Sequence, residues 1–278
     1  MVSIILYVLI AIFLVYWIVG LILYSMQSRF LYKPVKGAEC MQGELGAEFE
    51  SVKLTADDGM EIKGWHIPPQ DEGYTILFCH GKGGSIIRRL DTIKLLSEMG
   101  LGFFIFDYRG YGDSKDKTTE AGTYLDAGAA YKWLNEERCI PEEKIVVFGR
   151  SLGASIAAYL AAKVNCGGVV LENAFTSYAA MGQRIYPYMP VKRFAKFKYD
   201  TKKYLESVSC PILFFHSKDD EVVPYEFGRE LFESFGCNKR FVDTIGKHDD
   251  SFLMSLDIYK KGWVDFLGYL YGLQSKEN

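Results

Sequence analysis

A serine flanked by two glycines lies where an apolar segment meets an alanine-rich one, and this junction limits the folds open to the chain. Residues 144–148 read KIVVF, a composition typical of a buried strand. Residues 154–164 read ASIAAYLAAKV, which favours a helix. The GRSLG between them fits the G-x-S-x-G pattern, in which a serine projects from a sharp strand-to-helix turn above a parallel sheet. Ser151 is therefore a candidate nucleophile, and the alternative is a helix N-cap serine between two unrelated glycines.

Strand-like and helix-like segments alternate along most of the chain. We expect strands at 49–55, 61–67, 74–79, 102–107, 144–148, 168–172, 211–216 and 240–244, and helices at 86–99, 119–138, 154–164, 225–235 and 252–270. A DDG turn between the first two strands favours a hairpin. The later alternation predicts an α/β fold with a mostly parallel eight-stranded sheet and helices on both faces. Ligands of such sheets bind at the carboxyl ends of strands, where five polar side chains fall: His80, Asp107, Ser151, Glu172 and His216.

His248 is the candidate base for Ser151. A serine hydroxyl becomes a strong nucleophile only when a neighbouring base removes its proton. In folds with a G-x-S-x-G elbow, the chain order is nucleophile, acid and then histidine. The chain has four histidines, and His248 alone follows the last expected strand, in the loop GKHDDS. A surface histidine without a catalytic part is the alternative interpretation.

Several carboxylates compete for the place of the acid that orients the histidine: Asp219, Asp220 and Glu221 follow one buried strand, and Glu172 ends an earlier one. Many proteins with this kind of sheet carry G-x-x-D-x-x-V-P after a late strand. Here Ser217 stands where the glycine would be, and Asp220 lies three residues on. We therefore prefer Asp220. Asp219 is the second choice, because adjacent side chains point apart and both cannot orient one ring, and Glu172 at the end of an earlier strand is the third.

Two backbone amides are expected to bind a developing oxyanion. The N–H of Leu152, the residue after the nucleophile, points into the space beside it in an elbow of this kind. Residues 78–85, FCHGKGGS, follow a buried strand and carry little side-chain bulk, so the N–H of Lys82 is the second candidate donor. The alternative, a phosphate-binding loop, lacks the G-x-x-x-x-G-K-[ST] pattern.

The N-terminal segment is apolar over a length that fits a bilayer. Val2–Tyr24 carries no charged residue and would reach about 35 Å as a helix, enough to cross the hydrocarbon core. A cleaved signal peptide is disfavoured because the apolar run is long and lacks a basic n-region and an A-x-A site. A buried core helix is disfavoured because the segment is apolar on all sides. Arg29, Lys33 and Lys36 follow the segment and no basic residue precedes it, which predicts a single-pass membrane protein whose following domain is cytoplasmic.

Six motifs occur in the order found in one known family: HGKGGS, DYRGYGDS (107–114), GRSLG, LENAFTS (171–177), HSKDDEVVP and GKHDD. Together with an apolar anchor followed by QSRFLYKP, they make the chain resemble the α/β-hydrolase superfamily. Within it, the chain is similar to the Bem46-like branch of membrane-anchored serine hydrolases, which carry a serine aminopeptidase S33-type domain. We expect a transmembrane anchor at 1–28, a connector at 29–46 and an α/β-hydrolase domain at 47–273 with a short cap insertion at about 174–205. Two positions depart from the family's pattern: Lys82 stands where asparagine is frequent, and Ser217 stands where glycine is found. We expect these departures to affect substrate contacts more than the catalytic chemistry.

The resemblance implies hydrolysis of carboxylic esters through an acyl-serine intermediate. Ser151, Asp220 and His248 would form the catalytic triad, and the N–H groups of Lys82 and Leu152 the oxyanion hole. Serine at the elbow disfavours dehalogenases and epoxide hydrolases, which use aspartate there. Three alternatives stay open: a thioesterase or protein deacylase, an S33-type peptidase, although the HGGPG loop of prolyl aminopeptidases is missing, and a membrane-anchored scaffold with an inactive hydrolase fold.

The expected partners are a bilayer, through the N-terminal helix, and a small-molecule ester, either soluble or lipid-derived. The net charge of −3 gives no reason to expect nucleic-acid binding. Neither a cofactor nor a metal is expected, because a metal site made of His216, the nearby aspartates and His248 shows no metal-ligand spacing. Residues 190–199, PVKRFAKFKY, mix basic and aromatic side chains in the cap insertion, which fits a solvated helix face whose phenylalanines pack on the sheet. The alternative is contact of this segment with an anionic leaflet.

Overall fold

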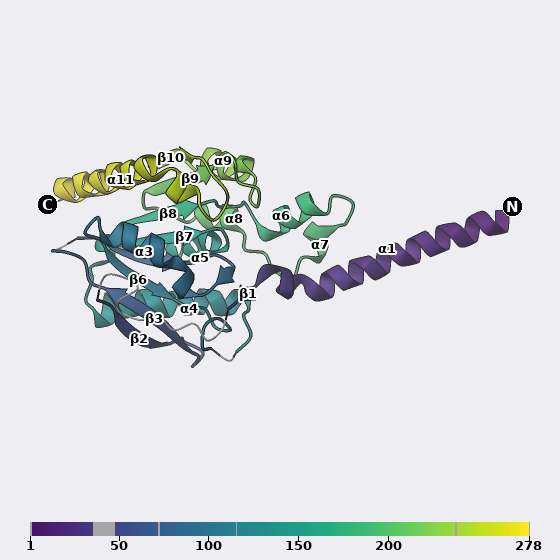
Figure 1. Cartoon of the computed structure of the whole chain (residues 1–278), viewed down its shortest axis with the longest axis horizontal. Coiled ribbons are helices and arrows are strands. Elements are labelled where there is room, and N and C mark those ends of the chain that lie inside the picture. The colour runs from purple at the N-terminus through teal and green to yellow at the C-terminus, as the bar shows by residue number, and fades with distance from the viewer. Residues whose placement is uncertain (1, 36–47, 72, 115, 237, 278) are drawn as a thin grey trace.

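A single long helix extends from a layered body of strands and helices (Figure 1). The structure is a computed structural model and describes residues 2–35, 48–71, 73–114, 116–236 and 238–277. The long helix is α1 (Val2–Leu31), and most of its side chains are exposed. The part of the expected connector from residue 36 to residue 46 lies outside the described residues.

The described strands form one large sheet and one small one. Eight strands make the large sheet, in the order β10-β9-β8-β7-β4-β6-β3-β2, and its neighbours run parallel except in the pairs β2–β3 and β3–β6. This confirms the predicted mostly parallel sheet and the hairpin at the DDG turn. The strands are β2 (Glu50–Thr55), β3 (Glu61–Ile67), β4 (Thr75–Cys79), β6 (Gly102–Phe106), β7 (Ile145–Arg150), β8 (Gly168–Glu172), β9 (Ile212–Ser217) and β10 (Lys239–Thr244).

Helices cover both faces of the large sheet. Successive residues of β4 point to opposite faces, so Ile76 and Leu77 join different apolar clusters, and β4 is buried throughout. The Leu77 cluster includes residues of α4, α5 and α9, and the Ile76 cluster includes residues of α3 and α11. The helices are α3 (Leu90–Ser97), α4 (Glu120–Lys132), α5 (Leu152–Ala161), α6 (Tyr178–Ile185), α7 (Val191–Phe194), α8 (Thr201–Leu205), α9 (Tyr225–Ser234), α10 (Ser251–Met254) and α11 (Leu256–Glu277).

The helix expected at 252–270 is divided in the structure. Helices α10 and α11 are separated at Ser255, whose hydroxyl accepts a hydrogen bond from the N–H of Ile245 at 2.8 Å and donates one to its carbonyl at 3.2 Å. These contacts to the end of β10 hold Ser255 outside helical geometry, at φ −115° and ψ 33°. A side chain that bonds a distant backbone segment therefore interrupts a continuous helical pattern.

A second, small sheet ties the end of α1 to the loop that follows β4. Strand β1 (Lys33–Pro34) pairs in parallel with β5 (Gly83–Gly84). The N–H of Lys33 also donates to the carbonyl of Lys82 at 3.1 Å. The apolar helix is thus joined through backbone hydrogen bonds to the loop that carries one candidate oxyanion donor.

Candidate active site

Ser151 lies on a strained turn between β7 and α5. Its backbone adopts φ 56° and ψ −118°, a conformation that costs energy for any residue other than glycine. Both flanking glycines are needed because the turn is tight: an added Cβ at Gly149 would lie 2.2 Å from the carbonyl oxygen of Gly153, and one at Gly153 would lie 1.9 Å from that of Cys79. Ser151 stands at the N-cap position of α5, but its side chain makes no capping hydrogen bond to the helix.

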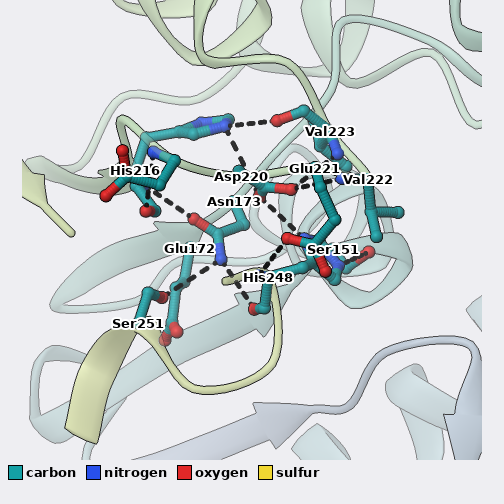
Figure 2. A network of polar contacts seen from close by, with 12 residues as sticks. Ser151, Glu172, Asn173, His216, Asp220, Glu221, Val222, Val223, His248 and Ser251 are labelled. Atoms are coloured by element: carbon teal, nitrogen blue, oxygen red, sulfur yellow. Dashed lines mark hydrogen bonds and ion pairs between the residues drawn. The ribbon is translucent and has the colours of Figure 1, made fainter. Parts of the chain in front are cut away.

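The structure brings Ser151, His248 and Asp220 into one chain of hydrogen bonds (Figure 2). Ser151 Oγ lies 2.9 Å from His248 Nε2, and His248 Nδ1 lies 2.7 Å from Asp220 Oδ2. All three side chains are almost completely buried, which shields their electrostatic interactions from water. The three residues come from the ends of β7, β9 and β10, as expected for the carboxyl edge of a parallel sheet.

The two competing carboxylates are held elsewhere. Asp219 accepts a hydrogen bond from the N–H of Gly246 at 3.2 Å. Glu172 forms a buried ion pair with Arg150 at 2.9 Å and accepts from the hydroxyl of Tyr259 at 2.8 Å. Of the three candidates, Asp220 is the one whose carboxylate contacts the His248 ring.

Asp220 is fixed in place by its own loop. Its Oδ1 atom accepts hydrogen bonds from the N–H groups of Val222 at 2.8 Å and Val223 at 2.7 Å, which leaves Oδ2 directed at His248 (Figure 2). His216 packs beside Asp220, with Nε2 3.0 Å from the carbonyl of Val223, and burial lowers the pKa of His216, which favours the neutral ring.

Two further side chains hold the loop of His248, and neither was predicted from the sequence. The carboxylate of Glu221 accepts the His248 backbone N–H at 3.0 Å. Asn173, in the left-handed region at φ 49°, donates to the His248 carbonyl at 3.0 Å and accepts from the Ser217 N–H at 3.1 Å. The motif LENAFTS, which contains Asn173, was the available signal, but it does not reveal a backbone contact to a loop 75 residues away.

Lys82 and Leu152, the predicted oxyanion donors, both lie at the wall of the pocket that contains Ser151. Leu152 begins α5, whose N-terminal end attracts negative charge. The carbonyl of Lys82 accepts from the N–H of Lys33 at 3.1 Å and from the hydroxyl of Tyr111 at 2.8 Å, and these bonds hold the residue beside the elbow.

The remaining polar residues at the sheet edge support the loop of Lys82. The ring of His80 is fully buried between Tyr108 and Tyr111, and burial lowers its pKa to about 3, so the ring is neutral at pH 7. Asp107 accepts a hydrogen bond from the N–H of Ile86 at 3.0 Å, and burial raises its pKa to about 7. Neither side chain bonds to the Ser151–His248–Asp220 chain in the described part of the molecule, so we assign both to the scaffold.

The pocket at Ser151 has a wall that the sequence analysis did not anticipate. It has a volume of about 680 Å³, within the range of small-molecule sites. One wall comes from α6, α7 and the segment between them, and another comes from the C-terminal half of α1, from Tyr16 to Leu31. The anchor, in which no site residue was expected, therefore contributes to the pocket.

Comparison with known proteins shows the family to which the chain belongs. A family model described as alpha/beta hydrolase fold matches residues 74–190. A protein of Mycobacterium tuberculosis that is named uncharacterized is 32% identical over 84% of both chains. An uncharacterized membrane protein of Saccharomyces cerevisiae is 30% identical over 83% of this chain and 86% of its own length. The solved structure of a Pyrococcus furiosus esterase superposes with a TM-score of 0.70 at 23% identity, over 86% of this chain and 97% of that chain. The chain belongs to the α/β-hydrolase family, and its relatives agree with the Bem46-like branch that the motifs indicated.

Proposed function

We propose that this chain is a serine hydrolase that cleaves carboxylic esters through an acyl-serine intermediate. The observation that carries the proposal is the chain of contacts from Ser151 Oγ to His248 Nε2 and from His248 Nδ1 to Asp220 Oδ2, at 2.9 and 2.7 Å. A serine within hydrogen-bond reach of a base, itself oriented by a third group, is the arrangement that activates a hydroxyl. Similarity to a protein named an esterase agrees with this choice.

The reaction would proceed in two halves. Ser151 Oγ attacks the ester carbonyl carbon while His248 Nε2 takes the hydroxyl proton, and the N–H groups of Lys82 and Leu152 bind the oxyanion that forms. As the tetrahedral intermediate collapses, the C–O bond to the alcohol breaks and the alcohol leaves with the proton from His248. A water molecule then attacks the acyl-serine in the same way, which releases the carboxylic acid and restores Ser151. Throughout, the Asp220 carboxylate stays ionised and stabilises the imidazolium of His248.

The N-terminal helix supports a membrane location for this reaction. Helix α1 has 30 residues, a length of about 45 Å, and is long and apolar enough to cross a bilayer. We propose that α1 spans the membrane once and that the hydrolase domain is cytoplasmic, because Arg29 and Lys33 follow the apolar run. The domain would then act at the surface of the membrane that holds it.

The proposal is tested by labelling the full-length protein in membranes with a fluorophosphonate, which reacts with activated serines. Ser151→Ala should abolish labelling. The matched control Ser207→Ala, at an exposed serine, should label like the wild type. Labelling that persists in Ser151→Ala would refute Ser151 as the nucleophile. Absence of labelling in the wild type would favour the scaffold alternative.

A further inference from the structure

The pocket at Ser151 lies between the catalytic domain and the apolar N-terminal helix. Figure 1 shows α1 leaving the body beside α6 and α7, which form the insertion after β8. Hydrogen bonds join the two parts: the hydroxyl of Tyr16 donates to the carbonyl of Tyr188 at 3.0 Å, and the amide of Gln27 donates to the carbonyl of Phe194 at 3.2 Å. The carbonyl oxygen of the same Gln27 side chain accepts the N–H of Lys196 at 2.8 Å. These contacts fix α1 as a wall of the pocket.

One face of α1 lines the pocket and the opposite face is free. Lining positions such as Tyr16, Gly20, Leu23 and Gln27 recur every three or four residues, the spacing of one helix face, and Trp17, Leu21 and Tyr24 beside them also line the pocket. Between them, Ile18, Val19 and Ile22 do not line the pocket and are exposed by 56, 40 and 50%. In a bilayer, this second face would contact lipid. The same helix therefore borders both hydrocarbon and pocket.

The pocket combines the residues of the proposed reaction with mostly apolar walls. Ser151, Leu152 and Lys82 line the pocket on the side of the catalytic domain. Apolar side chains of the insertion, such as Met181, Ile185 and Val191, line it together with α1. From Tyr16 to Leu31 the α1 wall extends for about 22 Å at 1.5 Å per residue. A pocket with these walls suits an ester bond beside Ser151 and a long hydrocarbon chain along the apolar side chains.

We propose that this pocket binds the fatty-acyl chain of an ester lipid that enters from the bilayer alongside α1. The inference rests on the proposed serine hydrolysis and names its substrate class. A chain that moves from the hydrocarbon core into a pocket walled by a membrane helix does not have to cross water, which would cost about 0.8 kcal/mol per methylene group. The exposed side chains of Tyr188, Ile185 and Phe194 lie on the same insertion and extend the apolar surface toward the bilayer. Hydrolysis consumes water at the ester and leaves a fatty acid and an alcohol.

The test compares two esters with one leaving group in the full-length protein, reconstituted in phosphatidylcholine vesicles. One ester is p-nitrophenyl palmitate dissolved in the bilayer, and the other is p-nitrophenyl acetate in the water. Gly20→Phe places a ring on the pocket face of α1, where an added Cβ has no atom within 4 Å. Val19→Phe places the same ring on the outward face and is the matched control. Relative to Val19→Phe, Gly20→Phe should lower the ratio of kcat/KM for the palmitate to kcat/KM for the acetate by about tenfold, the effect of losing burial of about two methylene groups.

Each outcome bears on one proposal. Equal palmitate activity in Gly20→Phe and Val19→Phe would overturn the acyl-chain site and leave the serine chemistry untouched. Loss of both activities in Ser151→Ala is required by the proposed function, and survival of both would refute that function instead. If Gly20→Phe lost acetate hydrolysis as well, a second pair of variants would replace it: Leu21→Trp on the pocket face and Ile22→Trp on the outward face. A lower palmitate-to-acetate ratio of kcat/KM in Leu21→Trp than in Ile22→Trp would support the acyl-chain site, and equal ratios would overturn it. Faster cleavage of a palmitoyl-cysteine peptide than of the vesicle ester would indicate that the pocket binds a lipidated protein. That result would refute an ester lipid as the substrate.

Discussion

His248 Nε2 lies 2.9 Å from Ser151 Oγ, so this imidazole is positioned to take the proton of the hydroxyl. Ser151→Ala and His248→Ala should therefore each lower kcat for a short-chain p-nitrophenyl ester by about 10³-fold or more. The effects should not add in the double variant, because the two residues act as one unit. An additive loss, measured by steady-state kinetics, would contradict a shared step.

At the acid position, two adjacent aspartates provide an internal control. Asp220→Asn should lower kcat by about 10³- to 10⁴-fold, because an amide that donates to His248 favours the wrong tautomer. Asp219→Asn should retain nearly full activity, since its side-chain oxygen can still accept the Gly246 N–H. If Asp219→Asn were the inactive variant, Asp220 would not be the orienting acid.

The burial of Asp107 should make the free energy of unfolding depend on pH. Burial raises its pKa to about 7, above about 3.9 in an unfolded chain, so the folded state binds the proton more tightly. Stability from this group is therefore full at low pH and is lost as the pH rises from about 4 to about 7. Relative to Asp107→Asn, the wild type should lose about 2 kcal/mol of unfolding free energy between about pH 5 and pH 7. Urea denaturation followed by tryptophan fluorescence measures the difference, and parallel pH curves would refute it.

At the scale of elements, the β7–α5 turn depends on the absence of a Cβ. Gly153→Ala would place a methyl group 1.9 Å from the Cys79 carbonyl oxygen, so it should destabilise the fold by about 3 kcal/mol and remove activity. Gly128→Ala in α4 is the matched control, because its Cβ would meet no atom within 4 Å. This control should gain about 0.5 to 1 kcal/mol from helix propensity. Thermal unfolding compares the two, and a wild-type midpoint for Gly153→Ala would contradict the close packing.

The elements with strong periodicity were predictable from the sequence. Strands β3 and β8 match their expected bounds, and the other six strands of the large sheet differ by one or two residues at one or both ends. The pairing of β1 with β5 was not predictable, because two-residue strands joined only by backbone groups carry no side-chain pattern. The short helices α6, α7 and α8 were likewise missed, since each is too brief to show a helical period.

The candidate site was predictable where a motif existed. Ser151, His248 and Asp220 follow strand ends in a recognisable order, and the structure brings these three together. The α1 wall could not be predicted, because Gln27 and Tyr16 bind backbone carbonyls of the insertion, and backbone acceptors occur in any sequence. The support from Glu221 and Asn173 was hidden for the same reason.

At the scale of the whole molecule, the charge around α1 predicts its orientation. Arg29 and Lys33 follow the apolar run, and exposed basic residues of the insertion beside α1 lie on the same side: Lys192, Arg193, Lys196 and Lys198. Such a cluster favours the cytoplasmic leaflet, at about 1 kcal/mol for each residue near an anionic surface. External protease should therefore leave the hydrolase domain intact in sealed right-side-out vesicles until detergent is added. Digestion of the domain before detergent is added would show that it faces the outside and would refute the predicted orientation.

The same basic cluster should bind anionic lipid. Changing Lys192, Arg193, Lys196 and Lys198 to glutamine in a protein that lacks residues 1–28 should weaken binding to vesicles that contain phosphatidylserine. Hydrolysis of a small soluble ester should change little, because none of these four side chains lines the pocket. Binding should also weaken as salt is raised. Cosedimentation measures the bound fraction, and unchanged binding would leave the cluster as ordinary solvated surface.

The central claim is that Ser151 forms a covalent acyl intermediate, and trapping that intermediate tests it most directly. The full-length protein is mixed with excess p-nitrophenyl butyrate, quenched in acid within the first turnover and digested for mass spectrometry. The account predicts a burst of nitrophenol and a butyryl group on the peptide that contains Ser151. The adduct should be absent in Ser151→Ala and present in Asp219→Asn. Turnover without any acyl adduct, or with the adduct on another residue, would contradict the account.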